Sequence, residues 1–326
     1  MDFTLFLNSQ APTDQSAEEL FEGLVTQTRA ARDSGFDMVT MGQHYLADYV
    51  QLQLVPALSR LAAEAGSMSV ATGIVLLPLH HPVEIAEQIT TIGSFADEVV
   101  AGVGAGYRDA EFDAFGVDKR ERGPRLAEGI ELINRLWTEK GVSYDGEFYS
   151  VEDATITPRP DEKPEVWVAA NSRPAIERAA KLGDRWFVNP HATVAEITEQ
   201  KTLYDEHKEG DTSVPVFREV FVAETTEEAR EIARPYLEPK YERYVEWGQD
   251  EAMEDAEDLH RPFDDLAEDR FLLGTPEEVC EEIETYQETL DPSHMVCRVQ
   301  WPGLSYERAR ECIELIGDEV VPQVGG

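Results

Sequence analysis

Short apolar runs alternate with amphipathic stretches along most of this chain of 326 residues. The pattern is clearest between residues 69 and 116. There the apolar run SVATGIVLLPLHHP is followed by the helix-like EIAEQITTIG, a second apolar run, DEVVAGVGAG, and the polar segment YRDAEFDAFG. Periodicity predicts a strand, a helix, a second strand and a loop, in that order. Both strands are apolar on both faces, which favours a parallel sheet that is buried on either side.

The same alternation predicts elements before and after this central stretch. We expect strands at residues 3–7, 36–45, 166–172, 184–190, 214–224 and 295–302, helices at 16–35, 54–66, 120–141, 174–183, 194–207, 225–247 and 305–324, and a hairpin within 142–160. Strand and helix alternate about eight times without an internal repeat, which favours a (β/α)8 barrel over an open doubly wound sheet. We expect one domain over residues 1–326.

Residues 248–270 break this pattern. The segment GQDEAMEDAEDLHRPFDDLAEDR is rich in acidic residues and poor in apolar ones, so we do not expect it in the core. A solvated linker and a mobile lid over the barrel mouth both fit this composition.

A cluster of small residues lies where the strand near residue 100 ends. Gly102, Gly104, Ala105 and Gly106 would let the backbone lie flat against a ligand, and we predict a cofactor-binding wall there. The spacing does not match a dinucleotide fingerprint, which needs Gly-x-Gly-x-x-Gly leading into a helix. The alternative is that these glycines only ease the chain around a barrel corner.

In a barrel of this kind the active site lies at the carboxyl ends of the strands. The residues expected there are Asn8, His44, Tyr45, residues 78–81, residues 105–108, residues 171–173 and residues 189–191. They contain no His, Asp and Glu cluster with metal-ligand spacing, and the chain has no GxSxG motif. We therefore expect a bound cofactor, and not a metal, to supply the chemistry.

The charge balance is strongly acidic. The chain has 66 acidic and 28 basic residues, the latter 7 Lys and 21 Arg, and its formal net charge is −38. Acids spread over the whole chain predict a halophilic protein that is more stable in molar salt than in dilute buffer, because salt screens their repulsion. Nucleic-acid binding, which needs clustered Lys and Arg, is not expected.

Cysteine usage and hydropathy bear on localisation. Cys280, Cys297 and Cys312 are widely spaced and form no CxxC pair, which is typical of a reducing compartment. No apolar run approaches the roughly 20 residues of a membrane span, and the N-terminus lacks a basic signal-peptide start. We expect a cytoplasmic protein without a membrane partner.

The segments that hold the candidate residues also have a characteristic order and spacing. They are FTLFLNSQ, GFDMVTMGQHY, ATGIVLLPLHHPVEIAEQITTIG, GVGAGYRDAEFDAFGVDKRERGPRLAEGIELINRLWT, VWVAANSRPAIERAAKLGD and LLGTPEEVCEEI. Together they resemble, nearly from end to end, the bacterial luciferase-like monooxygenase family. The resemblance implies a TIM barrel that binds FMN, or the deazaflavin coenzyme F-420, at its carboxyl-terminal mouth.

The resemblance also implies roles for particular residues. His44 matches a histidine that acts beside the flavin as an acid or base, and imidazole suits proton transfer near neutral pH. The alternative is a histidine that is only hydrogen-bonded at the end of a strand. Gly73 and Ile74 match a bulge that carries a non-prolyl cis peptide in many relatives.

Asn171, Ser172 and Arg173 would form the phosphate site, because they precede a helix whose N-terminus attracts anions. The alternative is that Ser172 or Arg173 merely caps that helix. On the other side of the cofactor, the resemblance places Tyr107 together with Gly104, Ala105 and Gly106.

This chain departs from the family pattern at three positions. Ala105 stands where luciferases have a basic residue that binds phosphate, so light emission is not implied. Tyr107 stands where deazaflavin-dependent sugar phosphate dehydrogenases have an acid, which argues against that substrate. Gln43 replaces a common glutamate before the histidine.

The resulting prediction is a flavin-dependent oxidoreductase that oxygenates a small organic substrate with reduced FMN and O2, the FMN being reduced by a separate flavin reductase. Alternatives are an F-420-dependent reductase or dehydrogenase, which transfers hydride without oxygen, and a non-catalytic flavin-binding protein. By resemblance we expect a homodimer.

Overall fold

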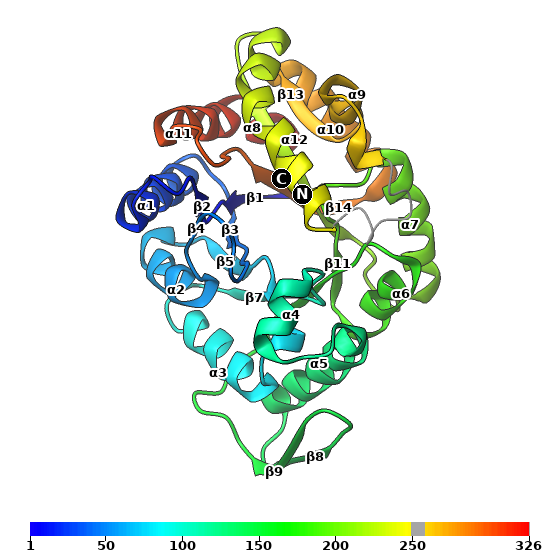
Figure 1. Cartoon of the computed structure of the whole chain (residues 1–326). Coiled ribbons are helices and arrows are strands. Elements are labelled where there is room, and N and C mark those ends of the chain that lie inside the picture. The colour runs from blue at the N-terminus through cyan, green and yellow to red at the C-terminus, as the bar shows by residue number, and fades with distance from the viewer. Residues whose placement is uncertain (249–257, 326) are drawn as a thin grey trace.

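A curled sheet of parallel strands forms the centre of the molecule, with helices around it (Figure 1). The computed structural model describes residues 1–248 and 258–325. The sheet has the strand order β11-β10-β7-β5-β3-β1-β14-β12-β13, and β6 pairs with β7. Its strands are β1 (Asp2–Leu7), β3 (Met38–Met41), β5 (Ser69–Thr72), β6 (Val75–Leu76), β7 (Val99–Gly104), β10 (Val166–Ala169), β11 (Arg185–Phe187), β12 (Val214–Val222), β13 (Phe271–Gly274) and β14 (Pro292–Arg298). The predicted parallel sheet is confirmed.

The chain just after β11, one end strand of the curled sheet, meets β12, the neighbour of the other end strand β13. Their link is one parallel bridge between Val188 and Val216, where Val188 N–H donates to Pro215 O (3.0 Å) and Phe217 N–H donates to Val188 O (3.1 Å). Beyond Val216, the same edge of β12 pairs with β13 instead. The barrel prediction is therefore confirmed as a curled parallel sheet enclosed by helices, while continuous strand pairing around a full ring is not seen.

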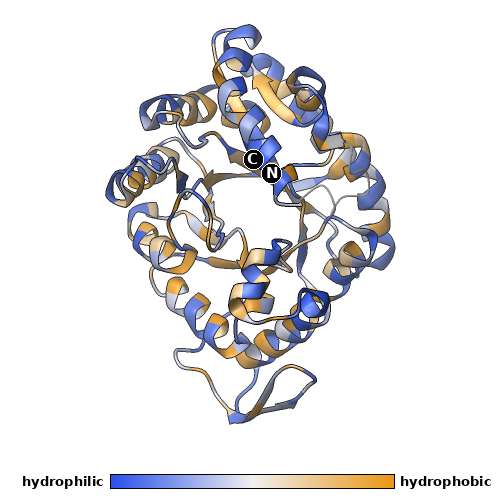
Figure 2. Cartoon of the chain, in the orientation of Figure 1, coloured by the Kyte–Doolittle hydropathy of each residue, from blue (hydrophilic) through white to orange (hydrophobic). Residues whose placement is uncertain are grey.

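The helices around the sheet are two-sided, with apolar residues toward the strands and polar residues outward, so that in Figure 2 many helices carry both colours. They are α1 (Ala17–Asp33), α2 (Leu54–Ala65), α3 (Pro82–Gly93), α4 (Asp109–Phe115), α5 (Arg122–Thr138), α6 (Arg173–Leu182), α7 (Val194–His207), α8 (Thr226–Glu246), α9 (Phe263–Ala267), α10 (Pro276–Leu290), α11 (Tyr306–Leu315) and α12 (Val321–Val324). Capping boxes at Ser16, Thr193 and Thr275 begin three of them. None of the helices within the described ranges is both long enough and apolar enough to cross a membrane.

Two small antiparallel pairs lie outside the main sheet, β2 (Gln10–Ala11) with β4 (Val50–Gln51) and β8 (Val142–Asp145) with β9 (Ser150–Ala154). The second pair is the hairpin predicted within residues 142–160. The backbone N–H groups of Phe148 and Tyr149 donate to Glu128 on α5, which ties the hairpin to the outer ring of helices.

The inside of the curled sheet holds a small aromatic core of its own. Phe6, Phe187 and Phe217 belong to it, and the rings of Phe6 and Phe217 stack with centroids 4.5 Å apart. A much larger apolar layer lies between the strands and the helices. The inner core fills one end of the sheet, and this leaves the carboxyl ends of the strands as the open side.

The run predicted as one strand at residues 69–82 is broken in the middle. β5 ends at Thr72, β6 starts at Val75, and the peptide bond between Gly73 and Ile74 is cis, as the family resemblance implies. Neighbouring glycines make room for this break, because a Cβ on Gly102 would lie 1.8 Å from Thr72 O. Gly102 is thus needed for the close approach of two strands.

Three other sequence predictions need correction. The polar segment predicted as a loop after residue 106 forms the short helix α4, on which only Glu111 and Phe112 are buried. The strand β13 and the helix α10 were not predicted as elements. Within the segment 248–270, residues 249–257 lie outside the described residues, and after them Leu259, Phe263 and Leu266 are buried against the main core, which a solvated linker or a mobile lid would not do.

Candidate active site

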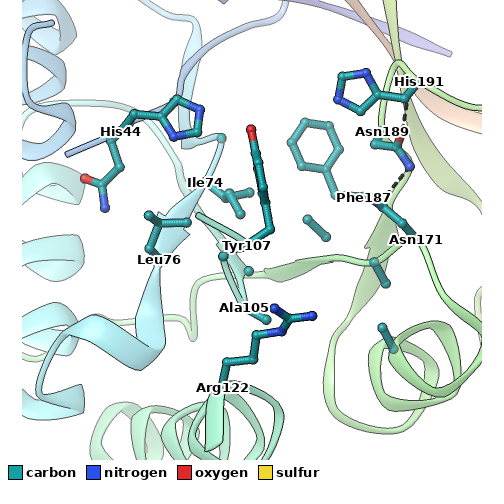
Figure 3. A pocket seen from close by; sticks show the side chains of 18 of the residues that line it. His44, Ile74, Leu76, Ala105, Tyr107, Arg122, Asn171, Phe187, Asn189 and His191 are labelled. Atoms are coloured by element: carbon teal, nitrogen blue, oxygen red, sulfur yellow. Dashed lines mark hydrogen bonds between the residues drawn. The ribbon is translucent and has the colours of Figure 1, made fainter. Parts of the chain in front are cut away.

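A cavity of about 920 Å³ opens at the carboxyl ends of the strands. This is the position that the barrel prediction assigns to the active site. Its lining includes the predicted residues His44, Gly73, Ile74, Gly104, Ala105, Gly106, Tyr107, Asn171 and Ser172 (Figure 3). Arg173, by contrast, is exposed and does not line the cavity. The structure therefore gathers at one place all the predicted site residues except Arg173.

His44 lies on one side of the cavity and is hydrogen-bonded to a buried carboxylate. Its Nδ1 is 3.1 Å from Glu111 Oε1, and the same oxygen accepts from Tyr45 N–H (2.9 Å) and from Arg108 Nη1 (3.2 Å). Because Glu111 accepts through a carboxylate oxygen, Nδ1 of His44 carries a hydrogen and Nε2 is left for the cavity. His44 thus lines the cavity and is hydrogen-bonded to a buried carboxylate, which is the arrangement that a proton carrier would need.

Glu111 is almost fully buried, at 1 % exposure. Burial by itself raises the pKa of a carboxyl group, but the hydrogen bond and charge of His44, the Tyr45 N–H and the Arg108 guanidinium together lower the pKa of Glu111 below its ordinary value. The other oxygen, Oε2, is buried without a hydrogen-bond partner in the described structure. Glu111 thus stays ionised and holds its charge next to His44.

Aromatic rings surround the imidazole. Tyr107 and Trp247 lie edge-on to His44, with ring centroids 6.1 and 5.2 Å away, and the Arg108 guanidinium packs 4.0 Å from the Trp247 ring. Burial raises the pKa of Tyr107 well above its ordinary value. Trp247, just after α8, thus packs against both His44 and Arg108.

Ile74 and Gly104 form the wall between β6 and β7. A Cβ on Gly104 would lie 2.0 Å from Ile74 Cδ1, so only glycine at this position lets the Ile74 side chain lie over the end of β7. Gly106 has a positive φ of 74°. The glycines therefore shape a cavity wall, and Gly102 also serves the packing role that was the alternative interpretation.

The N-terminus of α6 lies at another part of the cavity. Ser172 occupies the N-cap position but makes no side-chain capping bond, so its hydroxyl is not used by the helix. Arg178, five residues after Arg173 on α6, and Arg122 at the start of α5 both line the cavity. Burial and then the charge of Arg122 lower the pKa of Arg178. In the described part of the chain, no carboxylate lies within ion-pair distance of either guanidinium; the carboxylate of Asp109, which also lines the cavity, pairs with Lys119 and interacts with Arg122 only at longer range.

Asn171 connects two strand-end loops. Asn189 Nδ2 donates to Asn171 Oδ1 (2.7 Å), and Asn189 Oδ1 accepts from His191 N–H (2.7 Å). Figure 3 shows this chain of contacts across the cavity from His44. The predicted phosphate-site residue Asn171 is thereby fixed in place by a residue from the next loop.

A second buried carboxylate lies behind the cavity wall, on β12. Glu219 accepts from Lys240, from Arg298 Nη1 (3.2 Å) and from Trp301 Nε1 (2.6 Å). Arg298 lines the cavity, and its guanidinium lies 4.4 and 4.5 Å from the centroids of the stacked Phe6 and Phe217 rings. These residues were not predicted as part of the site.

The sequence contained weak signals for the residues that were missed. Arg108 and Glu111 have the i, i+3 spacing of a helical ion pair, but the segment was predicted as a loop, so the spacing had no structural meaning. Arg218 and Glu219 interrupt the otherwise apolar run VPVFREVFV, and charged residues in a strand buried on both faces indicate a special environment.

No group of His, Cys, Asp and Glu suited to a metal is found among the described residues. Residues 1–292 match the sequence profile of the luciferase-like monooxygenases. The chain belongs to the luciferase-like monooxygenase family. Named proteins similar to this chain include dehydrogenases and monooxygenases, both of which are oxidoreductases.

Two curated proteins illustrate the range of the family. An F420-dependent glucose-6-phosphate dehydrogenase of Kineococcus radiotolerans is 30 % identical over 179 residues, which cover 52 % of this chain and 53 % of the relative. The chain thus matches about half the length of that relative. The oxygenase component of a flavin-dependent trigonelline monooxygenase of Acinetobacter baylyi is 24 % identical over 352 residues, covering 99 % of this chain and 95 % of the relative.

Among solved structures, monooxygenase RslO1 of Streptomyces bottropensis has the same fold. The TM-score is 0.88 at 22 % identity, and the alignment covers 99 % of both chains. The luciferase-like members similar to this chain thus include both flavin monooxygenases and F420-dependent dehydrogenases.

Proposed function

We propose that this protein oxygenates a small organic substrate with reduced FMN and O2. The observation that carries the proposal is that the cavity contains both the pair of His44 with the buried Glu111 and two guanidinium groups that have no carboxylate at ion-pair distance among the described residues. A proton carrier and an anion-binding site within one cavity match the two ends of a flavin, a redox ring and a phosphate.

The residues present fit such a cofactor. Arg122, Arg178 and the free hydroxyl of Ser172 would hold the phosphate, together with the N–H groups at the start of α6. Ile74 and Tyr107 would lie against the ring. Arg178 would take the role that the sequence gave to Arg173, because Arg173 at the start of α6 is exposed, while Arg178, five residues later and on another face of the helix, lines the cavity.

When bound, reduced FMN supplies the electrons that activate O2. The protein positions the substrate and handles protons: His44 gives or takes a proton at Nε2 while Glu111 stabilises the charged imidazole. The enclosing Tyr107 and Trp247 rings keep water away from this step.

Hydride transfer with F-420 is the alternative chemistry, and the 30 % identical dehydrogenase supports it. FMN is preferred here because the monooxygenase relative matches over nearly the whole chain, whereas the dehydrogenase matches over about half. A non-catalytic flavin-binding protein is the third alternative, but it gives the His44 and Glu111 pair no role.

By its resemblance to the family, the protein should also have a closed (β/α)8 barrel, form a homodimer in the cytoplasm and receive reduced FMN from a separate reductase. Sedimentation analysis tests the dimer, and a sedimenting monomer at micromolar concentration would contradict it.

Cofactor binding provides the first test. Titrations of the protein with FMN and separately with F-420, followed by fluorescence, should show binding of FMN, and Arg178→Gln should weaken it by about tenfold because a charge-assisted hydrogen bond is lost. Arg173→Gln is the matched control and should bind normally. Tight binding of F-420 alone would replace the monooxygenase proposal by the hydride-transfer alternative, and binding of FMN without turnover of any electron acceptor would favour the non-catalytic one.

A further inference from the structure

The cavity wall formed by β12, β14 and α8 contains more buried positive charge than negative charge. Lys240 and Arg298 share the one carboxylate of Glu219. Nearby, Arg218 Nη1 donates to Asn189 O (3.2 Å). Within residues 1–248 and 258–325, neither Lys240 nor Arg298 has a second carboxylate at ion-pair distance, and Arg218 has none. One anion thus compensates several cations in a protein whose net charge is strongly negative.

Two buried nitrogen atoms of cavity-lining residues on this side have no hydrogen-bond partner in the described structure: Arg298 Nε on β14 and His191 Nδ1 in the loop after β11. Each of the two residues is 7 % exposed. Arg218 Nη2 on β12 also lacks a partner, but Arg218 does not line the cavity. Both hydrogen bonds of the Arg298 guanidinium use Nη1, to Glu219 and to the Tyr244 hydroxyl (3.4 Å). Buried donors without partners are costly, so a ligand that accepts from them would be stabilising.

The surroundings of His191 keep it uncharged. Burial, followed by the charges of Lys240, Arg298, Arg270 and Arg218, lowers the pKa of His191 well below its ordinary value. The wall therefore offers a fixed guanidinium charge at Arg298 with a neutral imidazole and the Tyr244 hydroxyl beside it. The Phe6 and Phe217 rings, which stack on each other, also lie against this guanidinium.

We propose that this wall binds the carboxylate of the substrate, and that the substrate is therefore a small organic acid. Nη1 of Arg298 is already hydrogen-bonded, so the edge of the guanidinium formed by Nε and Nη2 remains for a ligand. Two N–H groups along this edge can donate to the two oxygens of one carboxylate. One open guanidinium edge and neutral neighbours suit a monoanion better than a phosphate dianion. The inference rests on the proposed function, since it names the substrate class of the same cavity.

The wall lies across the cavity from His44, as the positions of His191 and His44 in Figure 3 show. A substrate anchored by its carboxylate at Arg298 would extend toward Ile74 and Tyr107 in the middle of the cavity. Arg298 would thus determine which end of the substrate faces the redox ring, and so select both the substrate and the atom that reacts.

Calorimetric titration of the cofactor-free protein with benzoate and hexanoate, and with benzamide and hexanamide as neutral analogues, tests the inference. We expect at least one carboxylate to bind and its amide to bind at least about tenfold more weakly. Arg298→Gln should weaken carboxylate binding by about tenfold or more, Arg298→Lys should restore part of it, and the exposed Arg173→Gln should have no effect.

Arg298→Gln also removes a partner of Glu219, so its melting temperature is measured alongside. His191→Phe gives a second test that leaves the ion pairs intact, and it should also weaken the carboxylate. Equal binding of acids and amides, no binding of either carboxylate, or binding that survives both substitutions would overturn the inference. Stronger binding of inorganic phosphate than of the carboxylates at Arg298 would overturn the choice of a carboxylate.

The same variants are titrated with FMN and F-420. If FMN and F-420 both fail to bind while Arg298-dependent carboxylate binding is found, the proposed cofactor is wrong and the acid site stands. If Arg298→Gln abolishes cofactor binding and no carboxylate binds, the cations serve the cofactor and the inference is wrong.

Discussion

Glu111 and Glu219 are both buried carboxylates beside the same cavity, yet their surroundings differ. Glu111 accepts from the imidazole of His44, and its second oxygen has no partner in the described structure. Glu219 accepts through both oxygens, from Lys240, Arg298 and Trp301. Glu111 is thus paired with a histidine that lines the cavity, while Glu219 compensates two basic side chains that the fold buries.

This difference shows how one residue type serves two purposes in one cavity. A buried acid beside a histidine can influence proton transfer, because the histidine gains or loses its charge during the reaction. A buried acid that pairs with two buried basic groups stabilises their charged forms, and its removal leaves those charges without compensation in a medium of low polarity. We therefore expect Glu219 to determine stability and Glu111 to affect turnover.

The largest effect is expected for Glu219→Gln. Since Lys240 and Arg298 lose their shared counter-ion, the free energy of unfolding should fall by about 3–5 kcal/mol. Urea denaturation at pH 7 measures it. Glu209→Gln, at an exposed position, should change stability by less than about 0.5 kcal/mol. If the two variants are equally stable, Glu219 is not the charge anchor described above.

Substitution of the proton carrier comes next. His44→Ala should lower turnover by about a hundredfold, because general acid–base catalysis is lost, while FMN binding and stability change little. Steady-state kinetics and an FMN titration on one preparation separate the two effects. Turnover that stays at the level of the unaltered protein would remove His44 from the mechanism.

Glu111→Gln should lower turnover by about tenfold, less than His44→Ala, because the imidazole remains but its partner is neutral. The stability of this variant should also depend differently on pH in the acid range. The pKa of Glu111 is lower in the folded protein than its ordinary 4.5, so its carboxylate contributes stability above that pH and loses the contribution as pH falls below it. Acid unfolding followed by circular dichroism should be less steep in Glu111→Gln, and identical curves would contradict the buried ion pair.

The smallest expected effect concerns Lys240. Burial, with the charge of Arg298, lowers the pKa of Lys240 from 10.5 to about 7, in spite of Glu219. Between about pH 7 and 10.5 the unfolded chain binds a proton that the folded protein does not, so this group makes stability rise with pH in that range. Lys240→Met should lack this rise. Unfolding free energies at pH 7 and pH 9 test it, and an unchanged difference between the two would show that Lys240 is not buried as described.

The comparison also marks what could be predicted from sequence. Nearly all the helices and strands follow from hydrophobic period and capping residues, because these are local properties of the chain. Glu111 was missed because its segment was predicted as a loop, although it forms the short helix α4. Glu219 was missed because nothing near it in the sequence reveals Lys240 and Arg298, which reach it from α8 and β14.

The sequence by itself determined the order of strands and helices, the parallel sheet and the family, since each depends on residue pattern along the chain. Only the tertiary structure decided which charged groups come into contact. It places Arg178 and not Arg173 at the cavity, and it pairs Glu111 with His44 and Glu219 with Lys240 and Arg298. The physical reason is that electrostatic partners are selected by distance in space and by burial, and the curled sheet brings together strand ends that are far apart in the chain.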